Sequence, residues 1–269
     1  RKIMITIIIV VYHSNKEKLQ SILNKVGTKY KIILVDNSTN YNFKDIKLTK
    51  KTKIIRSKNI GNGAGINLGL NKVNTKFAIY FDIDTIFKKN FLEKFLKLAK
   101  NTKDFAVLLP NNGKLKSKKK LVENYNFEGS IMLFNMTHFK KFNFFDENIF
   151  LYYEEIDLFL RFRKNKKKVF VASNLSIIHQ QGSSVSLKNN NELIYLRLWH
   201  YMWSMFYVYN KNYGYLFAIK KCYIYLIKDL MMMCVFFFKF DKFNLLKRFN
   251  SISGLIISML NIRSFKRIK

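Results

Sequence analysis

Cysteine is scarce in this sequence, which argues against a chain held together by disulfides or by structural zinc. The 269 residues include only Cys222 and Cys234, which are too far apart for a CxxC pair. A reducing compartment is therefore the expected environment. An apolar run near residue 1 ends at Tyr12 and His13 without a small-residue cleavage site, so we interpret it as a buried strand and do not expect export.

Acidic residues are also few, and the charge balance is strongly basic. Asp and Glu number 17 against 49 Lys and Arg, which gives a net charge of +32 at pH 7. Such a charge attracts polyanions, among them nucleic acid, anionic lipid and phosphate-bearing substrates. Only 8 of the basic residues are arginine, the side chain best suited to reading base edges. We therefore expect a lysine-coated surface and no nucleic-acid partner.

The chain lacks a long uninterrupted hydrophobic run, although hydrophobic residues make up 49% of it. This content suffices for a full core and excludes a mainly disordered chain. The most apolar stretch, residues 222–238, is interrupted by Lys228 and Asp229 and falls short of the ~20 apolar residues that span a bilayer. We expect residues 192–260, rich in aromatic residues, Met and Leu, to form helices that lie at a membrane surface or pack on the rest of the protein.

Short apolar segments alternate with helical patterns before this tail. Residues 3–11 are almost all β-branched and apolar without alternation, which is typical of a strand covered on both faces. Similar segments follow at residues 31–36, 53–57, 77–82, 105–110, 129–134, 169–172 and 176–179. Helical spacing occurs at residues 15–26 and 155–162, and Asn90 with Glu93 resembles a capping box at the start of a third helix. This order predicts a doubly wound α/β layer.

The composition changes twice along the chain. Pro110, the only proline, precedes a lysine-rich segment at residues 111–120 that we expect to be an exposed loop joining two halves. The aromatic tail begins beyond Gly182. We therefore predict an α/β domain over residues 1–190, divided into 1–112 and 113–190, and a helical region over residues 191–269.

Two aspartates follow one of the predicted strands. In an open parallel sheet, ligands bind beyond the carboxyl ends of the strands. Asp82 and Asp84 lie at such an end, and side chains two residues apart on a strand leave the same face. Their oxygen atoms suit Mg²⁺ or Mn²⁺, although a turn with two solvated carboxylates has the same pattern. Asp82 and Asp84 are therefore our candidate metal ligands.

A glycine-rich segment follows another strand. Residues 59–69 have glycine at positions 61, 63, 65 and 69, which would let the backbone approach a ligand closely before a helix begins. The segment is neither a P-loop nor a GxGxxG fingerprint, because no glycine stands at position 66 and no GK[ST] follows.

Six motifs occur in an order and spacing that resemble one enzyme family. They are VVYHSN at residues 10–15, LVDNS at 34–38, NIGNGAGINLG at 59–69, DID at 82–84, FLYYEEIDL at 150–158 and HQQGSS at 179–184. Together they resemble family 2 glycosyltransferases of the GT-A fold, and most closely the rhamnosyltransferase-like members that build bacterial surface polysaccharide. The resemblance covers roughly residues 3–185. It implies a Rossmann-like, mostly parallel α/β sheet with a C-terminal helical extension.

The resemblance implies roles for residues at the edge of the sheet. Tyr12 and Asp36 would hold the nucleotide base and ribose. A divalent cation, Mn²⁺ or Mg²⁺, would bind Asp84 with His179 and Asp82 near the diphosphate, although a histidine hydrogen-bonded in the core is the alternative for His179. The other nucleotide-sugar contacts would come from Asn59, Gly61, Gly63, Asn67 and Asp82. Residues 1–112 would be the nucleotide-sugar-binding half, and residues 113–190 the acceptor-binding half.

An acidic cluster at residues 154–157 would supply the general base. The family more often has Glu-Asp where this chain has Glu154 and Glu155, so the base by position is Glu155, with Glu154 and Asp157 as alternatives. Residues two apart on a helix point about 200° apart, so Glu155 and Asp157 cannot both face one substrate. Carboxylates at a helix start are stabilised by the helix dipole whatever their role, and Asp157 is predicted to pair with Arg161 on the surface.

The implied activity is an inverting, metal-dependent transfer of a hexosyl or deoxyhexosyl group. The donor would be a nucleotide-diphosphate sugar, and the acceptor a glycan or polyprenyl-diphosphate-linked molecule in surface polysaccharide synthesis. We expect a cytoplasmic enzyme, peripheral on the cytoplasmic face of the inner membrane, with residues 191–269 on the anionic surface. The alternative is a non-catalytic membrane-surface module that binds an anionic lipid-linked glycan.

Overall fold

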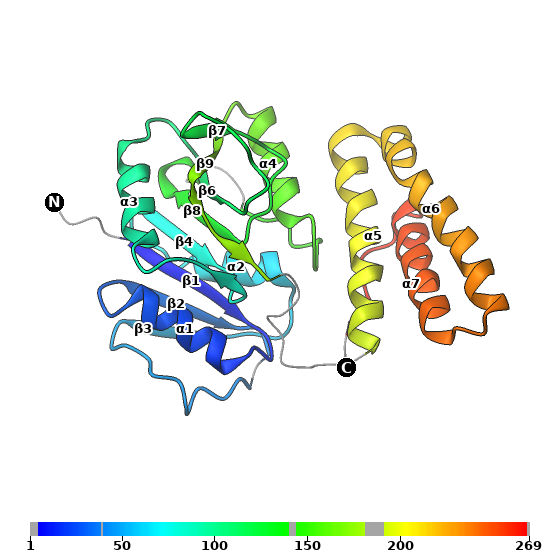
Figure 1. Ribbon diagram of the computed structural model, residues 1–269, viewed down its shortest axis with the longest axis horizontal. Coiled ribbons are helices and arrows are strands. Elements are labelled where there is room, and N and C mark those ends of the chain that lie inside the picture. The colour runs from blue at the N-terminus through cyan, green and yellow to red at the C-terminus, as the bar shows by residue number, and fades with distance from the viewer. Residues whose placement is uncertain (1–4, 39, 140–143, 181–190, 268–269) are drawn as a thin grey trace. The chain divides into compact units, whose positions relative to one another are not determined.

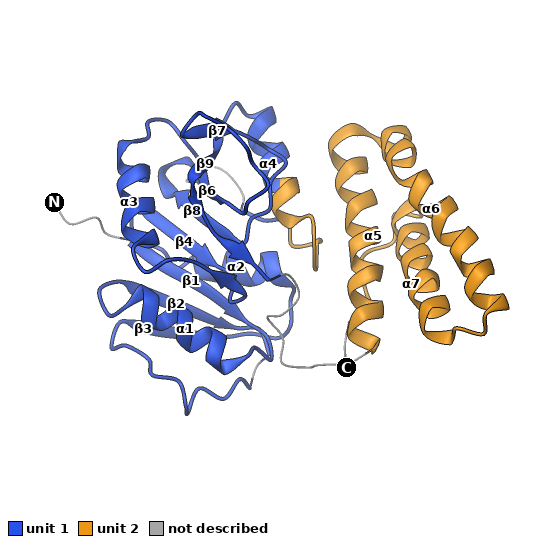
Figure 2. Ribbon diagram, viewed as in Figure 1, with its two compact units in different colours: residues 1–145, 158–186 blue, residues 146–157, 187–269 orange. Residues whose placement is uncertain are grey.

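The computed structural model describes residues 5–38, 40–139, 144–180 and 191–267. The chain forms two compact units (Figure 2). The first contains residues 1–145 and 158–186, and the second contains residues 146–157 and 187–269. The boundary we predicted after residue 190 stays a prediction, and the short segment 146–157 groups with the tail.

The first unit is built on an eight-stranded sheet with the order β3-β2-β1-β4-β8-β6-β9-β7 (Figure 1). Its strands are β1 (Ile5–Val11), β2 (Lys31–Asp36), β3 (Thr52–Arg56), β4 (Phe77–Phe81), β6 (Val107–Asn111), β7 (Leu121–Glu123), β8 (Ile131–Asn135) and β9 (Val169–Ser176). The first four strands in the order run parallel, and β8 is antiparallel to both of its neighbours. A short antiparallel pair, β5 (Thr85–Ile86) and β10 (Ile178–His179), stands apart. The doubly wound layer predicted from the sequence is confirmed.

Helices cover both faces of this sheet. They are α1 (Lys16–Val26), α2 (Asn62–Leu70), α3 (Phe91–Asn101) and α4 (Glu154–Lys164), with a 3-10 turn, η1, at Met136–Phe139. Apolar residues of α1 and α3 share one core cluster with Ile7 and Ile9 of β1, whereas α2 and residues 158–162 of α4 share the other cluster with Ile8. The alternation of Ile7, Ile8 and Ile9 between two cores explains why β1 lacks a polar face.

Helix α1 follows the predicted pattern in detail. Asn15 caps it by accepting a hydrogen bond from Lys18 N, and its inner face is buried. Gly27 ends the helix at φ +71°, a conformation that glycine adopts without strain.

Three local predictions were wrong. Asn90 makes no side-chain cap to α3, because its ψ of 5° departs from the extended conformation in which a cap side chain reaches the next turn. The strand predicted at residues 169–172 continues to Ser176, since β9 pairs with β6 as far as Asn111 through a register shift. Aspartates 82 and 84 lie beyond β4 in a turn, because the strand ends at Phe81.

The second unit contains three helices: α5 (Asn191–Tyr213), α6 (Tyr215–Phe238) and α7 (Lys242–Met259). Their core includes Met202, Phe206, Cys222 and Leu255. Gly254 of α7 lies directly on the backbone of α5, where an added Cβ would stand 2.2 Å from Trp199 O. Within the described part of the chain, no helix is both long and apolar enough to cross a bilayer.

Candidate active site

The polar residues predicted from the sequence follow the carboxyl ends of β1, β2 and β4. Parallel strands end at the same edge of a sheet, so Tyr12, Asp36 and Asp82 begin this edge in three neighbouring strands. Tyr12 is half-buried, and Asp36 is fully buried. The edge also receives a segment from far along the chain.

That segment is β10, which brings His179 to the acidic turn. His179 pairs with Thr85 in the short antiparallel sheet, and Gln180 N donates to Asp84 O. His179 Nε2 therefore lies 3.0 Å from Asp84 Oδ1 and 3.8 Å from Asp82 Oδ2. The turn itself is fixed because Thr85 N and Oγ1 both donate to Asp82 O.

Asp82 and His179 both have a raised pKa at this site. Burial, followed by the charge of Asp84, raises the pKa of Asp82, against the opposing charge of His179. Burial alone would lower the pKa of His179, but the hydrogen bond and charge of Asp84 and the charges of Asp82 and Glu128 outweigh it and raise the pKa. The site therefore concentrates negative charge that attracts a cation, and protons compete for it.

The donor set fits a divalent cation. One ligand atom from each of Asp82, Asp84 and His179 lies within 4.8 Å of the others. His179 Nδ1 is buried without a hydrogen-bond partner among the described residues, so one nitrogen of the ring can still make a further polar contact. Carboxylate with imidazole suits Mn²⁺, and the carboxylates alone suit Mg²⁺. The core-histidine alternative for His179 does not explain this cluster of acidic neighbours.

Glu128 lies on the Nδ1 side of His179, opposite the two aspartates. Its Oε2 atom is 3.9 Å from His179 Nδ1, and it also accepts from Asn112 and pairs with Lys114. Glu128 could not be predicted from the sequence, because a single glutamate in a loop belongs to no local pattern.

Asp36 is held by the protein at all its acceptor positions. Ser38 donates twice to Oδ1, and Tyr41 N and Arg56 donate to Oδ2 at 3.0 and 3.2 Å. A carboxylate offers about four lone-pair sites. A contact with a nucleotide would therefore replace one of these bonds, of which that of the half-exposed Arg56 is the most accessible.

The glycine-rich segment is largely helical, whereas we expected a helix to begin only after it. Helix α2 begins at Asn62, and Gly61 precedes it at φ +100° without a side-chain cap from the described residues. A Cβ on Gly69 would stand 2.6 Å from Ile8 Cγ2, so this glycine lets α2 approach the sheet closely. Asn59 is half-buried, and Gly61 and Gly63 are buried at the start of the helix.

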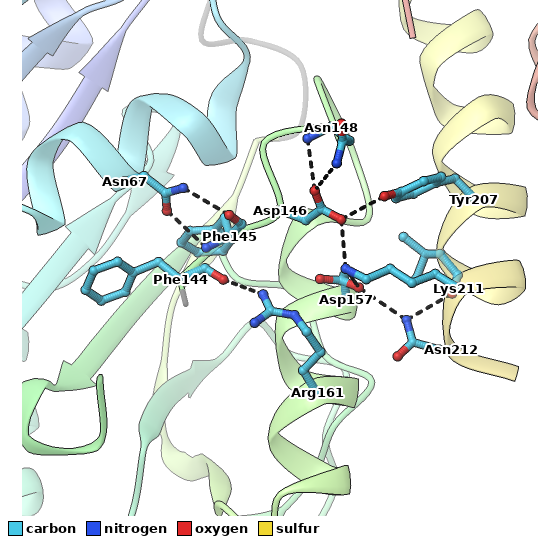
Figure 3. Close-up of polar contacts among 11 residues, drawn as sticks. Asn67, Phe144, Phe145, Asp146, Asn148, Asp157, Arg161, Tyr207, Lys211 and Asn212 are labelled. Atoms are coloured by element: carbon cyan, nitrogen blue, oxygen red, sulfur yellow. Dashed lines mark hydrogen bonds and ion pairs between the residues drawn. The ribbon is translucent and has the colours of Figure 1, made fainter. Parts of the chain in front are cut away.

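Asn67 has a structural partner. Its side-chain amide donates to Phe145 O and accepts from Phe145 N, both at 3.0 Å, and Arg161 donates to Phe144 O beside it (Figure 3). These bonds fix the chain just before residue 146. The predicted contact of Asn67 with a nucleotide sugar stays a prediction.

The acidic cluster at residues 154–157 belongs to the second unit, and its members differ in burial. Glu154 and Asp157 are 5% and 0% exposed, whereas Glu155 is partly buried. The prediction that Asp157 lies in a surface ion pair is wrong because Asp157 is fully buried, and its carboxylate lies 2.8 Å from the ammonium of Lys211 of α5. Nothing near Lys211 in the sequence indicates this contact.

The sheet order, with helices on both faces and a C-terminal helical region, is that of a GT-A type nucleotide-sugar transferase fold. The chain belongs to glycosyl transferase family 2, whose model matches residues 6–171. It is thus a glycosyltransferase of GT-A type. The HQQGSS motif lies outside the described residues from position 181 onward.

Two solved structures are similar in fold. The mannosyltransferase PcManGT from Pyrobaculum calidifontis, in complex with GDP-Man and Mn²⁺, matches with a TM-score of 0.57 and 9% identity over 97% of this chain and 88% of its own. Residues 1–349 of TarS from S. aureus match with a TM-score of 0.50 and 17% identity over 74% of this chain and 65% of that one. No curated protein sequence matches the chain.

Proposed function

We propose that the chain is a metal-dependent, inverting glycosyltransferase whose cation is held by Asp84, His179 and Asp82. The observation that carries this proposal is the cluster itself, with its ligand atoms within 4.8 Å of one another at the carboxyl edge of the sheet. A bound Mn²⁺ or Mg²⁺ would supply positive charge that stabilises the departing diphosphate.

The donor would lie along the same edge. Tyr12 and Asp36 would contact the base and ribose. Asp82, Asn59, Gly61 and Gly63 at the start of α2, and Asn67 within that helix, would line the nucleotide sugar. The N-terminal amides of α2 support this role, since the first N–H groups of a helix favour anionic ligands.

The proton acceptor would be Glu155. The acceptor hydroxyl must reach the base, and among the three candidates Glu155 is the one residue that is not buried, which argues against Glu154 and Asp157. Its place in the first turn of α4 stabilises the carboxylate form.

In the proposed reaction, Glu155 takes the proton of the acceptor hydroxyl as the hydroxyl oxygen bonds to the anomeric carbon. The bond from that carbon to the diphosphate oxygen breaks, and its electron pair leaves with the nucleoside diphosphate. One displacement on one face gives inversion.

A hexosyl or deoxyhexosyl donor and a glycan or lipid-linked acceptor complete the proposal, in line with the rhamnosyltransferase-like motifs. The test is release of nucleoside diphosphate from UDP-, GDP- and dTDP-sugars with Mn²⁺, with water as the slow acceptor and oligosaccharides added in turn. Glu155→Gln should lose turnover by ~100-fold while Mn²⁺-dependent donor binding remains. Glu155→Gln at wild-type turnover would remove Glu155 from the role. Absence of metal-dependent donor binding would favour the non-catalytic module.

We further propose that the second unit places the enzyme on the anionic, cytoplasmic face of the inner membrane through α6. Met231 and Phe238 of this helix are 65% and 79% exposed, and Lys220, Lys221 and Lys228 of the same helix are also exposed. The acidic Asp229 of α6 is instead buried and pairs with Arg248 of α7 at 2.9 Å. Such a face suits a helix lying in the plane of an anionic surface.

Co-sedimentation with vesicles tests this surface. The chain should bind vesicles containing phosphatidylglycerol more strongly than phosphatidylcholine vesicles, and Met231→Glu should weaken that binding. Asn101→Glu, which adds the same charge to the exposed end of α3, is the control. Lack of binding to either vesicle, or a dimer that Met231→Glu dissociates, would overturn the membrane assignment.

A further inference from the structure

One face of α5 holds the segment 146–157, which leads into the acidic turn of α4. The contacts come from Tyr201, Ser204, Tyr207 and Lys211, which follow one another at three- and four-residue spacing and therefore share a face of the helix. All of these contacts lie within the second unit.

Lys211 is the centre of the polar part of this face (Figure 3). Its ammonium lies 2.7 Å from Asp146 Oδ2 and 2.8 Å from Asp157 Oδ1, so it joins the two ends of the segment. Tyr207 donates to Asp146 at 2.9 Å, and Asn212 donates to Asp157 at 3.2 Å. Both carboxylates are largely or fully buried, at 10% and 0% side-chain exposure.

Replacement of Lys211 by an uncharged residue would remove the positive charge that both carboxylates contact. The ammonium of Lys211 lies between two largely buried carboxylates, and without it the two negative charges would face each other. Burial alone would raise the pKa of Asp146, but the hydrogen bond and charge of Lys211, together with the hydrogen bonds from Asn148 and Tyr207, outweigh it and lower the pKa. The ion pair therefore fixes the position of the segment.

The segment itself is strained just before the acidic turn. Tyr152 and Tyr153 both have φ of +66°, a region that side chains other than glycine rarely adopt. Ser204 Oγ donates to the preceding Leu151 O at 2.8 Å, and Tyr201 packs on both tyrosine rings. A strained backbone conformation persists only where neighbouring residues hold it in place. Here those neighbours are residues of α5.

We propose that Lys211 of α5 is a positioning residue for the general base: by joining Asp146 to Asp157 it sets the first turn of α4, and with it the carboxylate of Glu155. This inference rests on the proposed role of Glu155. It gives the helical unit a part in catalysis that is separate from membrane contact.

The experiment compares Lys211→Met, which removes the charge but keeps the aliphatic chain, with Lys211→Arg. Misplacing a reacting group by about 1 Å costs ~100-fold in rate. We therefore expect Lys211→Met to lower kcat by ~10- to 100-fold without changing Mn²⁺-dependent donor binding, and Lys211→Arg to restore part of the loss. Amide exchange of residues 151–157 should increase in Lys211→Met, whereas exchange in β1 and β4 should not.

Lys97→Met, on the exposed face of α3, is the matched control and should behave as wild type. Glu155→Gln is measured in parallel. If Glu155→Gln is inactive but Lys211→Met keeps wild-type kcat and exchange, the positioning role is wrong while the proposed function stands. If Glu155→Gln is active, the proposed function itself fails. Should Lys211→Met not fold, Ser204→Ala, which loses only the bond to Leu151 O, must show the same faster exchange and a smaller kcat loss, or the inference is overturned.

Discussion

The stability of the second unit should fall in mild acid because of one buried histidine. His200 of α5 is fully buried, with Nε2 2.9 Å from Lys266 O and Ser264 Oγ 3.3 Å from Nδ1. The Nε2–H therefore donates to the carbonyl, and Nδ1 accepts from the serine. An imidazole that donates at one nitrogen and accepts at the other is neutral.

Burial is the main cause that lowers the pKa of His200 to about 4, with the charges of Arg267 and Lys266 acting in the same direction against the hydrogen bond to Lys266 O. In the unfolded chain the imidazole of His200 has its ordinary pKa of 6.5, so it takes up a proton at a higher pH than in the folded chain. Stability from His200 is therefore complete above pH 6.5 and is lost as the pH falls toward 4. The difference in pKa corresponds to about 3 kcal/mol.

Tryptophan emission reports on this unit selectively, because both tryptophans of the chain, Trp199 and Trp203, are buried in α5. Urea unfolding followed at pH 7 and pH 4.5 should show a loss of free energy of unfolding in wild type that His200→Gln lacks. His13→Gln, in the first unit, controls for removal of a histidine. Equal losses in wild type and His200→Gln would refute the reasoning.

Three further outcomes follow from the packing and the site. Gly254→Ala should destabilise the second unit by about 3 kcal/mol in the same urea assay, because the new Cβ meets Trp199 O at 2.2 Å, whereas Ser253→Ala should change little. Asn67→Ala should cost about 2 kcal/mol in thermal unfolding, since Phe145 loses partners for both its N–H and C=O. Mn²⁺ affinity measured by calorimetry should rise from pH 5.5 to pH 8, because the raised pKa of His179 keeps a competing proton on the ring at low pH.

Local patterns were enough to predict most of the first unit. The apolar run of β1 and the helical spacing of α1 depend on residues close in sequence, and the structure confirms them. The cap predicted at Asn90 failed because capping also requires an extended backbone, which composition does not reveal.

Candidate site residues within sequence motifs could be selected from the sequence. Contacts that only the tertiary structure creates could not. Asp82 and Asp84 were selected at a strand end, and His179 by resemblance, although the pairing of β10 with β5 that joins them spans distant parts of the chain. Asp157 could be paired from the sequence only with a neighbour one turn away. Its partner Lys211 lies on α5, and no local pattern distinguishes this lysine from the others.

The most direct test of the central claim is Mn²⁺ binding followed by electron paramagnetic resonance in wild type, Asp84→Asn and His179→Ala. Wild type should bind one Mn²⁺ per chain in the presence of GDP or UDP, and both variants should lose this binding while keeping the fold seen by circular dichroism. Wild-type affinity for Mn²⁺ in Asp84→Asn and His179→Ala would contradict the assignment of the acidic turn as a metal centre.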